Sequence, residues 1–133
     1  MFVRAEYQEV KSRLEEQRMF IQVIAGPRQI GKSTLVGQVL DKITLPYSSF
    51  SADNELNVTQ AWISNVWDAV RNEMTVRHEK EHILVIDEIQ KIENWSEVVK
   101  KEWDRDTREN RNLKVLLLGS SRLLLKKGLT ESL

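Results

Sequence analysis

Residues 26–33 place two glycines, a lysine and a serine at the spacing of a phosphate-binding loop. The segment satisfies the pattern G-x-x-x-x-G-K-[ST] at every defined position. Paired glycines let successive backbone N–H groups point inward around an anion, and a helix that begins there directs its positive end at phosphate. Lys32 would bring its charge to the β- and γ-phosphates, and the Ser33 hydroxyl would ligate Mg²⁺. The residues predicted to bind nucleotide are Gly26, Pro27, Arg28, Gln29, Ile30, Gly31, Lys32, Ser33 and Thr34.

Two acidic residues follow the apolar run Ile83–Ile86 and would complete such a site. A buried strand over this run would deliver Asp87 to the carboxyl edge of a sheet, where its carboxylate would hold Mg²⁺ directly or through water. Glu88, one residue further on, would orient or deprotonate the water that attacks the γ-phosphate. Strands often end in acidic residues at a solvated turn, so this pair becomes specific only together with the phosphate loop.

Gly119, Ser120 and Ser121 follow another apolar run, Val115–Leu118, and form a third polar group. A hydroxyl at the end of this strand would lie between the acidic pair and the γ-phosphate, where it would sense whether the phosphate is present. Ser120 is the first choice for this role and Ser121 the second. The alternative is an ordinary turn, since glycine and serine are common turn residues.

An arginine near the γ-phosphate would stabilise the charge that spreads over the phosphoryl oxygens, an effect of about 10³–10⁵-fold in rate. Arg122, directly after the polar group, is the candidate for this catalytic role. Arg28, inside the phosphate loop, either contacts phosphate or pairs with an acidic neighbour, and the sequence leaves both open. Three further arginines are expected on or just after a helix and facing solvent: Arg105, Arg108 and Arg111.

Apolar runs and amphipathic segments alternate along the chain and predict the elements that position these residues. Continuous apolar strands alternating with helices are typical of an α/β fold, with a parallel sheet covered on both faces. Asn94 would cap the helix that follows it, with Glu97 in a capping box. The charge-rich stretch Arg71–His82 is expected to be a fraying helix end and a solvated connection. The predicted strands are 19–25, 46–50, 83–86 and 113–118, and the predicted helices are 4–18, 32–40, 58–75, 95–108 and 121–127.

The composition fits one soluble domain. The chain has 133 residues with 20 basic and 20 acidic side chains, and this zero net charge gives no support to nucleic acid or an anionic membrane as a partner. The apolar runs are too short to span a bilayer, the N-terminus lacks the apolar core of a signal peptide, and cysteine is absent. These features predict a cytoplasmic protein. The element pattern breaks off at Leu133 without a cap or polar tail, so residues 1–133 are expected to be a single, truncated domain.

Residues 78–82 match H-E-x-x-H, the zinc-peptidase pattern. On a helix, His78 and His82 would share one face and Glu79 would act as the base. The segment offers no apolar face for burial, and a third zinc ligand would have to be a carboxylate because the chain has 2 histidines. A surface connection is therefore favoured over a zinc hydrolase. Helical spacing likewise favours core packing of Trp62 and Trp67 over stacking on bases.

Three segments together resemble the signatures of a prokaryotic AAA-type ATPase family, whose members frequently carry a nuclease-like domain after the ATPase core. They are Gly26–Thr34, the distinguishing run Asp87-Glu-Ile-Gln-Lys-Ile-Glu-Asn-Trp95, and Leu118–Arg122, in the right order over nearly the whole chain. The resemblance implies a P-loop NTPase fold with strand order 1-4-3-2 and the fifth strand of the family missing. It also implies ATP and Mg²⁺ as ligands, and hydrolysis coupled to movement of a partner or C-terminal domain.

Two functions from different classes remain open on the sequence. One is an ATPase, and the other is a nucleotide-dependent regulatory or binding module with little or no turnover. Lys32, Asp87 and Glu88 favour the enzyme, whereas the truncation favours weak turnover. A GTPase is disfavoured because Asn-Lys-x-Asp is absent, and a small-molecule kinase because an acidic pair suits activation of water better than transfer to an alcohol. Oligomer formation is compatible with either function.

Overall fold

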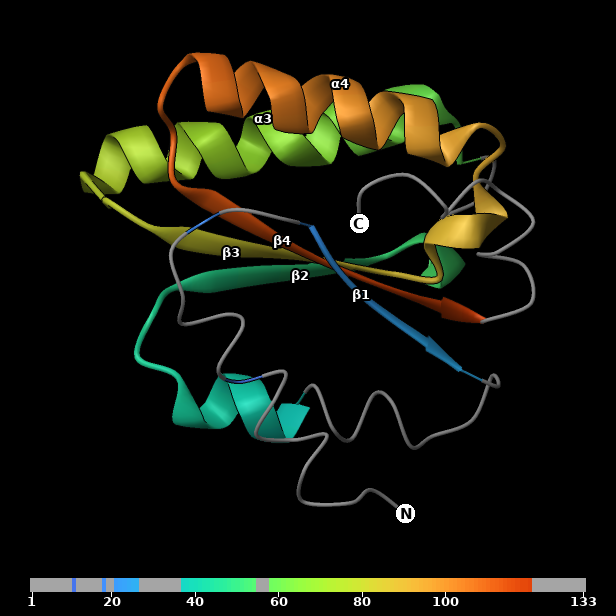
Figure 1. The fold of residues 1–133 in the computed structure, drawn as a ribbon, viewed down its shortest axis with the longest axis horizontal. Helices are drawn as coiled ribbons and strands as arrows, with labels where there is room; N and C mark the ends of the chain where they lie inside the picture. Colours follow the sequence, from blue (N-terminus) through green and yellow to red (C-terminus); the bar gives the residue numbers. More distant parts are fainter. Residues whose placement is uncertain (1–10, 12–17, 19–20, 27–36, 55–57, 121–133) are drawn as a thin grey trace.

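Four parallel strands form one sheet in the computed structural model, which describes residues 11, 18, 21–26, 37–54 and 58–120 (Figure 1). The strands are β1 (Gln22–Gly26), β2 (Tyr47–Ser51), β3 (His82–Asp87) and β4 (Leu113–Ser120), in the order β1-β4-β3-β2. Their neighbours pair in parallel throughout. The structure thus confirms the predicted α/β class and the strand order 1-4-3-2 of a P-loop NTPase-like fold.

Helices cover both faces of the sheet, as the continuous apolar strands predict. Figure 1 shows α3 (Gln60–Arg77) and α4 (Trp95–Arg108) side by side over one face, and the helix at residues 37–42 against the other. Side chains alternate along each strand, so successive apolar residues enter different cores. The core under α3 and α4 receives Leu84, Ile86, Val115 and Leu117, and the opposite core receives Ile83, Val85, Leu116 and Leu118.

A buried charge cluster joins α3 to α4 and corrects one expectation. Arg71 was expected at the start of a solvated connection, but α3 continues to Arg77 and Arg71 is buried. Asp106 of α4, also buried, accepts hydrogen bonds from Arg71 Nε at 2.8 Å and from Trp67 Nε1 at 2.8 Å. Arg111 donates to the same carboxylate at 2.7 Å and is half-buried, so its expected exposure to solvent is wrong as well. These side chains stay charged inside the protein because each has an opposite partner.

The helix start at Trp95 differs from the expected capping box. Asn94 is the N-cap residue, but its backbone is left-handed, with φ 57°, and its side chain makes no capping hydrogen bond. A side-chain cap requires an extended backbone at that position, which the tight turn before α4 does not allow. Gln60 at the start of α3 instead donates to the Asn94 carbonyl oxygen at 3.3 Å. Asparagine suits this place because it tolerates the left-handed region.

The two histidines of the zinc-peptidase pattern lie in different elements. Exposed His78 ends α3 in the left-handed conformation, whereas His82 is fully buried at the start of β3. The His82 ring contacts Glu79 Oε1 at 2.7 Å and Ser48 Oγ at 2.9 Å. His78 and His82 therefore do not share a helix face, which argues against a zinc site. His82 is also not part of a solvated connection.

The tryptophans of α3 pack in the core, as predicted. Trp67 is fully buried and Trp62 is partly buried against the same cluster.

Among the described residues, no helix is long and apolar enough to cross a membrane.

Candidate functional site

The register of the sheet brings residues from the three predicted motifs to one edge, where the strands have their carboxyl ends. Gly26, where the phosphate loop begins, pairs with Ser120 at the end of β4. β4 lies between β1 and β3, and β3 ends at Asp87, the partner of Ser51 on the edge strand. In open α/β sheets, ligands bind at the carboxyl ends of the strands, and these residues occupy that edge.

β4 is longer than predicted, and this changes the place of Ser120. Gly119 and Ser120 were expected in a turn, but they pair with Ala25 and Gly26 as the last residues of β4. The alternative of an ordinary turn therefore does not apply to Ser120. Strand pairing fixes its backbone beside the start of the phosphate loop.

The chain reverses sharply after β3, at Glu88. Glu88 adopts a left-handed backbone with φ 55°, and its N–H donates to Asp87 Oδ1 at 2.8 Å. A left-handed conformation costs a non-glycine residue about 1–2 kcal/mol, so the surrounding structure must hold it. Asp87 is partly exposed at the strand end, whereas Glu88 is buried. The two carboxylates thus occupy different environments at the same corner.

A short 3₁₀ helix, η2 (Ile89–Lys91), follows the corner and anchors it. Ile89 and Ile92 are fully buried in the core under α3 and α4. Lys91 forms an ion pair with Asp53 in η1 (Ala52–Asn54), the turn that follows β2. Apolar anchors on one side and an ion pair on the other hold the segment in place after β3.

Gln90 contacts Glu88 directly, and the sequence analysis gave this residue no role. Its Nε2 donates to Glu88 Oε1 at 2.7 Å, and both side chains are 6% exposed. The available signal was a polar residue enclosed by isoleucines, since Ile89 and Ile92 would both be expected in the core. Periodicity analysis misses such a position because the segment is too short to show a helical or strand pattern.

Asp87, at the carboxyl edge of the sheet, could hold a metal ion with its carboxylate. Asp87 provides a carboxylate, and no group of three or more His, Asp or Glu side chains placed to hold a metal ion occurs in the part of the chain that the structure describes. Mg²⁺ keeps several waters and binds through one or two carboxylates together with substrate phosphates, so a single carboxylate is compatible with it.

Several predicted site residues fall outside the described part of the chain. They are Pro27, Arg28, Gln29, Ile30, Gly31, Lys32, Ser33, Thr34, Ser121 and Arg122. The structure does place the competing arginines: Arg105 and Arg108 lie in the last turns of α4, and Arg111 precedes β4. They belong to the amino edge of the parallel sheet, whereas Asp87 lies at the carboxyl edge. None of the three is therefore near the predicted phosphate site.

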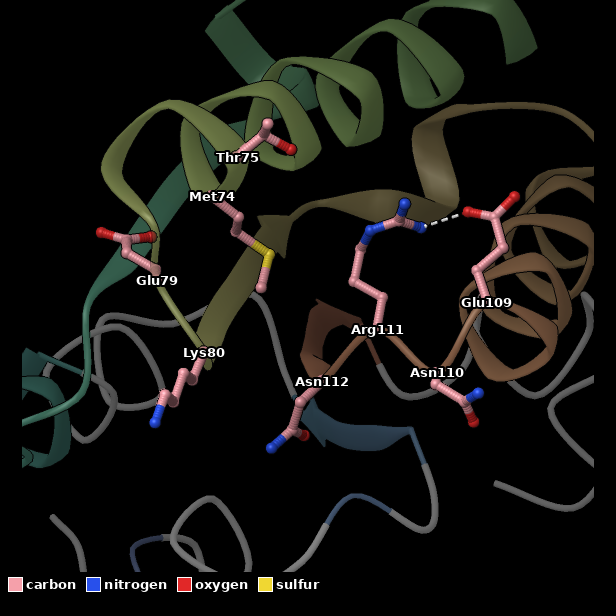
Figure 2. A pocket seen from close by; sticks show the side chains of 8 residues that line it. All are labelled: Met74, Thr75, Glu79, Lys80, Glu109, Asn110, Arg111 and Asn112. Carbon is pink, nitrogen blue, oxygen red and sulfur yellow. Dashed lines mark ion pairs between the residues drawn. The ribbon is translucent and has the colours of Figure 1, made fainter.

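A polar pocket of about 370 Å³ lies at that amino edge (Figure 2). It is lined by residues 74–75, 79–80 and 109–112, at the end of α3 and before β3 and β4. Figure 2 shows Arg111 beside Glu109, with which it forms an ion pair at 2.7 Å. The pocket lies at the edge opposite to the one that carries Asp87, so it is separate from the candidate nucleotide site.

Comparison with protein families adds an independent observation. Residues 18–133 match the family model described as the AAA domain, which covers most of the chain. The chain belongs to the AAA domain family. No curated protein matches the sequence. Membership in the AAA domain family supports a nucleotide-binding, P-loop ATPase-like core and agrees with the sheet order described above.

Proposed function

We propose that this AAA domain binds Mg·ATP at the carboxyl edge of its sheet and hydrolyses it. The observation that carries the proposal is the register of β1, β4 and β3. It puts Gly26 beside Ser120, on the strand next to the one that ends in Asp87, which Glu88 follows. A phosphate loop, a metal-binding carboxylate and a base must converge on one triphosphate, and this sheet order supports that convergence.

The proposed binding residues divide into phosphate and metal ligands. Gly26, the backbone amides of residues 27–34 and the Lys32 ammonium would hold the phosphates. Ser33 and Asp87 would hold Mg²⁺. When bound, Mg²⁺ neutralises charge on the β- and γ-phosphate oxygens.

Glu88 would act as the general base. Its carboxylate takes a proton from water while the water oxygen forms a bond to the γ-phosphorus. The bond from that phosphorus to the bridging oxygen breaks, and ADP leaves with the electron pair. Ser120, or Ser121 as second choice, would contact the γ-phosphate, and Arg122 would stabilise the charge on its oxygens.

The proposed role in the cell is to drive a partner. We propose that residues 1–133 form a single P-loop ATPase domain of a cytoplasmic protein and that hydrolysis moves a partner or C-terminal domain. The support is the resemblance to prokaryotic AAA-type ATPases, which frequently carry a nuclease-like domain. The zero net charge gives no support to nucleic-acid binding by this domain itself.

Hydrolysis by wild type and Glu88→Gln tests the proposal. We expect release of inorganic phosphate to fall about 10²–10⁴-fold in the variant, the usual contribution of a general base. ATP binding should persist in the variant, because glutamine keeps the size of the side chain. Glu97→Gln, at an exposed position in the first turn of α4, is the control and should hydrolyse ATP like wild type. Equal rates for wild type and Glu88→Gln would contradict the catalytic assignment of Glu88. ATP binding with no phosphate release in either protein would favour the nucleotide-dependent regulatory module.

A further inference from the structure

The side-chain amide of Gln90 has one satisfied end and one unsatisfied end. Its Nε2 donates to Glu88 Oε1 at 2.7 Å. Its Oε1 is buried and has no hydrogen-bond partner in the part of the chain that the structure describes. Leaving a buried acceptor unpaired costs about 1–3 kcal/mol, and contact with a water or ligand would remove this cost.

The amide orientation follows from its partner. A carboxylate accepts hydrogen bonds and donates none, so the nitrogen of Gln90 must face Glu88. The carbonyl oxygen is attached to the same carbon as that nitrogen. A water bound to Gln90 Oε1 can therefore also come within reach of the Glu88 carboxylate.

We propose that Gln90 is a further catalytic residue, which holds the Glu88 carboxylate with its N–H and accepts a hydrogen bond from the attacking water with its carbonyl oxygen. The proposal rests on the function proposed above and extends it. Water has two hydrogens, so it can donate one to each residue. Glu88 takes the first as the water oxygen bonds to the γ-phosphorus and the bond to the ADP oxygen breaks, while Gln90 orients the second. A side-chain amide orients the attacking water in other P-loop hydrolases, so the chemistry is well suited to the group.

Backbone hydrogen bonds hold the segment that carries the two side chains. Lys91 N donates to the Glu88 carbonyl oxygen at 3.1 Å, and Ile92 N donates to the Ile89 carbonyl oxygen at 3.1 Å. Ile89 and Ile92 are fully buried on either side of Gln90. A pair held in this way is preorganised, which is how enzymes position water at little cost during reaction.

Gln90→Met tests the proposal, because methionine matches the length of glutamine without its hydrogen bonds. We expect kcat to fall about 10- to 100-fold, with KM for ATP and the melting temperature near wild type. Binding of ADP with aluminium fluoride, which mimics the transition state, should weaken by a similar factor, while binding of ADP alone should not change. Glu93→Gln, an exposed position in the same segment, is the matched control.

A double variant separates a catalytic role from a structural one. Gln90→Met should cost little further activity in a Glu88→Gln background, because residues that act as a unit are not additive. If Gln90→Met folds poorly, Gln90→Asn is the second test. Asparagine keeps the amide but shortens its reach, so kcat should fall by a similar factor.

The opposing outcomes are distinct. A wild-type kcat in Gln90→Met would overturn the role of Gln90. The same conclusion would follow if kcat fell in Gln90→Met and Gln90→Asn only together with ATP affinity and folding stability. Failure of the proposed function would show earlier, as wild-type protein that binds no ATP or hydrolyses it independently of Glu88. In that event the role of Gln90 falls with the site that it serves.

Discussion

Arg71 of α3 donates from its Nε to Oδ1 of Asp106 on α4 at 2.8 Å, and both side chains are buried. Burial by itself lowers the pKa of Arg71, but hydrogen bonds to Asp106, Glu102 and Asp68 outweigh it and hold that pKa above its ordinary value. The guanidinium thus stays charged and links the two helices on the side of the sheet that carries η2. The same core, through Ile89 and Ile92, anchors the segment of Gln90.

Arg71→Met should destabilise the domain by about 3 kcal/mol, because it leaves Glu102 and Asp106 buried with one positive partner fewer. Urea unfolding measures the change. Arg77→Met is the control: Arg77 is exposed in the same helix and pairs with Glu73 at 3.5 Å, so its loss should cost less than about 0.5 kcal/mol. Equal effects for the two variants would show that the buried cluster adds no stability.

Glu109 should titrate below its ordinary value of 4.5. Hydrogen bonds from Arg111 and Arg105 lower the pKa of this carboxyl because they favour its charged form. The sign follows: the folded pKa lies below the unfolded one, so the contribution to stability is present above pH 4.5 and is lost as the pH falls through the folded pKa. Carboxyl-carbon NMR titration should show the Glu109 pKa rise toward 4.5 in Arg111→Gln. An unchanged pKa in that variant would refute the assignment.

Asn94→Ser distinguishes the observed helix start from the capping box predicted from the sequence. Serine is as good a side-chain cap as asparagine but tolerates the left-handed backbone less well. With φ at 57°, we expect the serine variant to lose about 1 kcal/mol and Asn94→Gly to stay within about 0.5 kcal/mol of wild type. Thermal unfolding of the two variants provides the comparison. A fully stable serine variant would support the capping box instead.

Much of the sheet could be predicted because the two central strands, β3 and β4, are largely apolar on both faces. The run Ile83–Ile86 is apolar at every position, so it is expected between two layers of helices. The observed burial confirms this expectation. The strand order came from the resemblance to a family, since hydrophobic pattern does not specify which strands are neighbours. The end of β4 was missed by two residues because Gly119 and Ser120 are typical of turns, whereas pairing with β1 overrides that preference.

The contacts that cross between elements could not be predicted. Arg71 is one charge among many in its stretch of sequence, and only the packing of α4 against α3 supplies Asp106 as its partner. Gln90 reaches Glu88 because the backbone turns through a left-handed residue, which sequence pattern does not reveal. The acidic pair itself was predictable from its place after a buried strand, and its roles in metal binding and base catalysis remain predictions.

Equilibrium binding of ATP, with and without Mg²⁺, to wild type and Lys32→Ala tests the central claim most directly. Binding is preferable to turnover because it does not depend on every catalytic group being present. The account predicts that wild type binds ATP more tightly with Mg²⁺ and in preference to GTP, and that Lys32→Ala weakens this binding by about 10-fold or more, since it removes a charged contact to phosphate. A well-folded wild type that binds no ATP, or that binds it equally well without Lys32, would contradict the account.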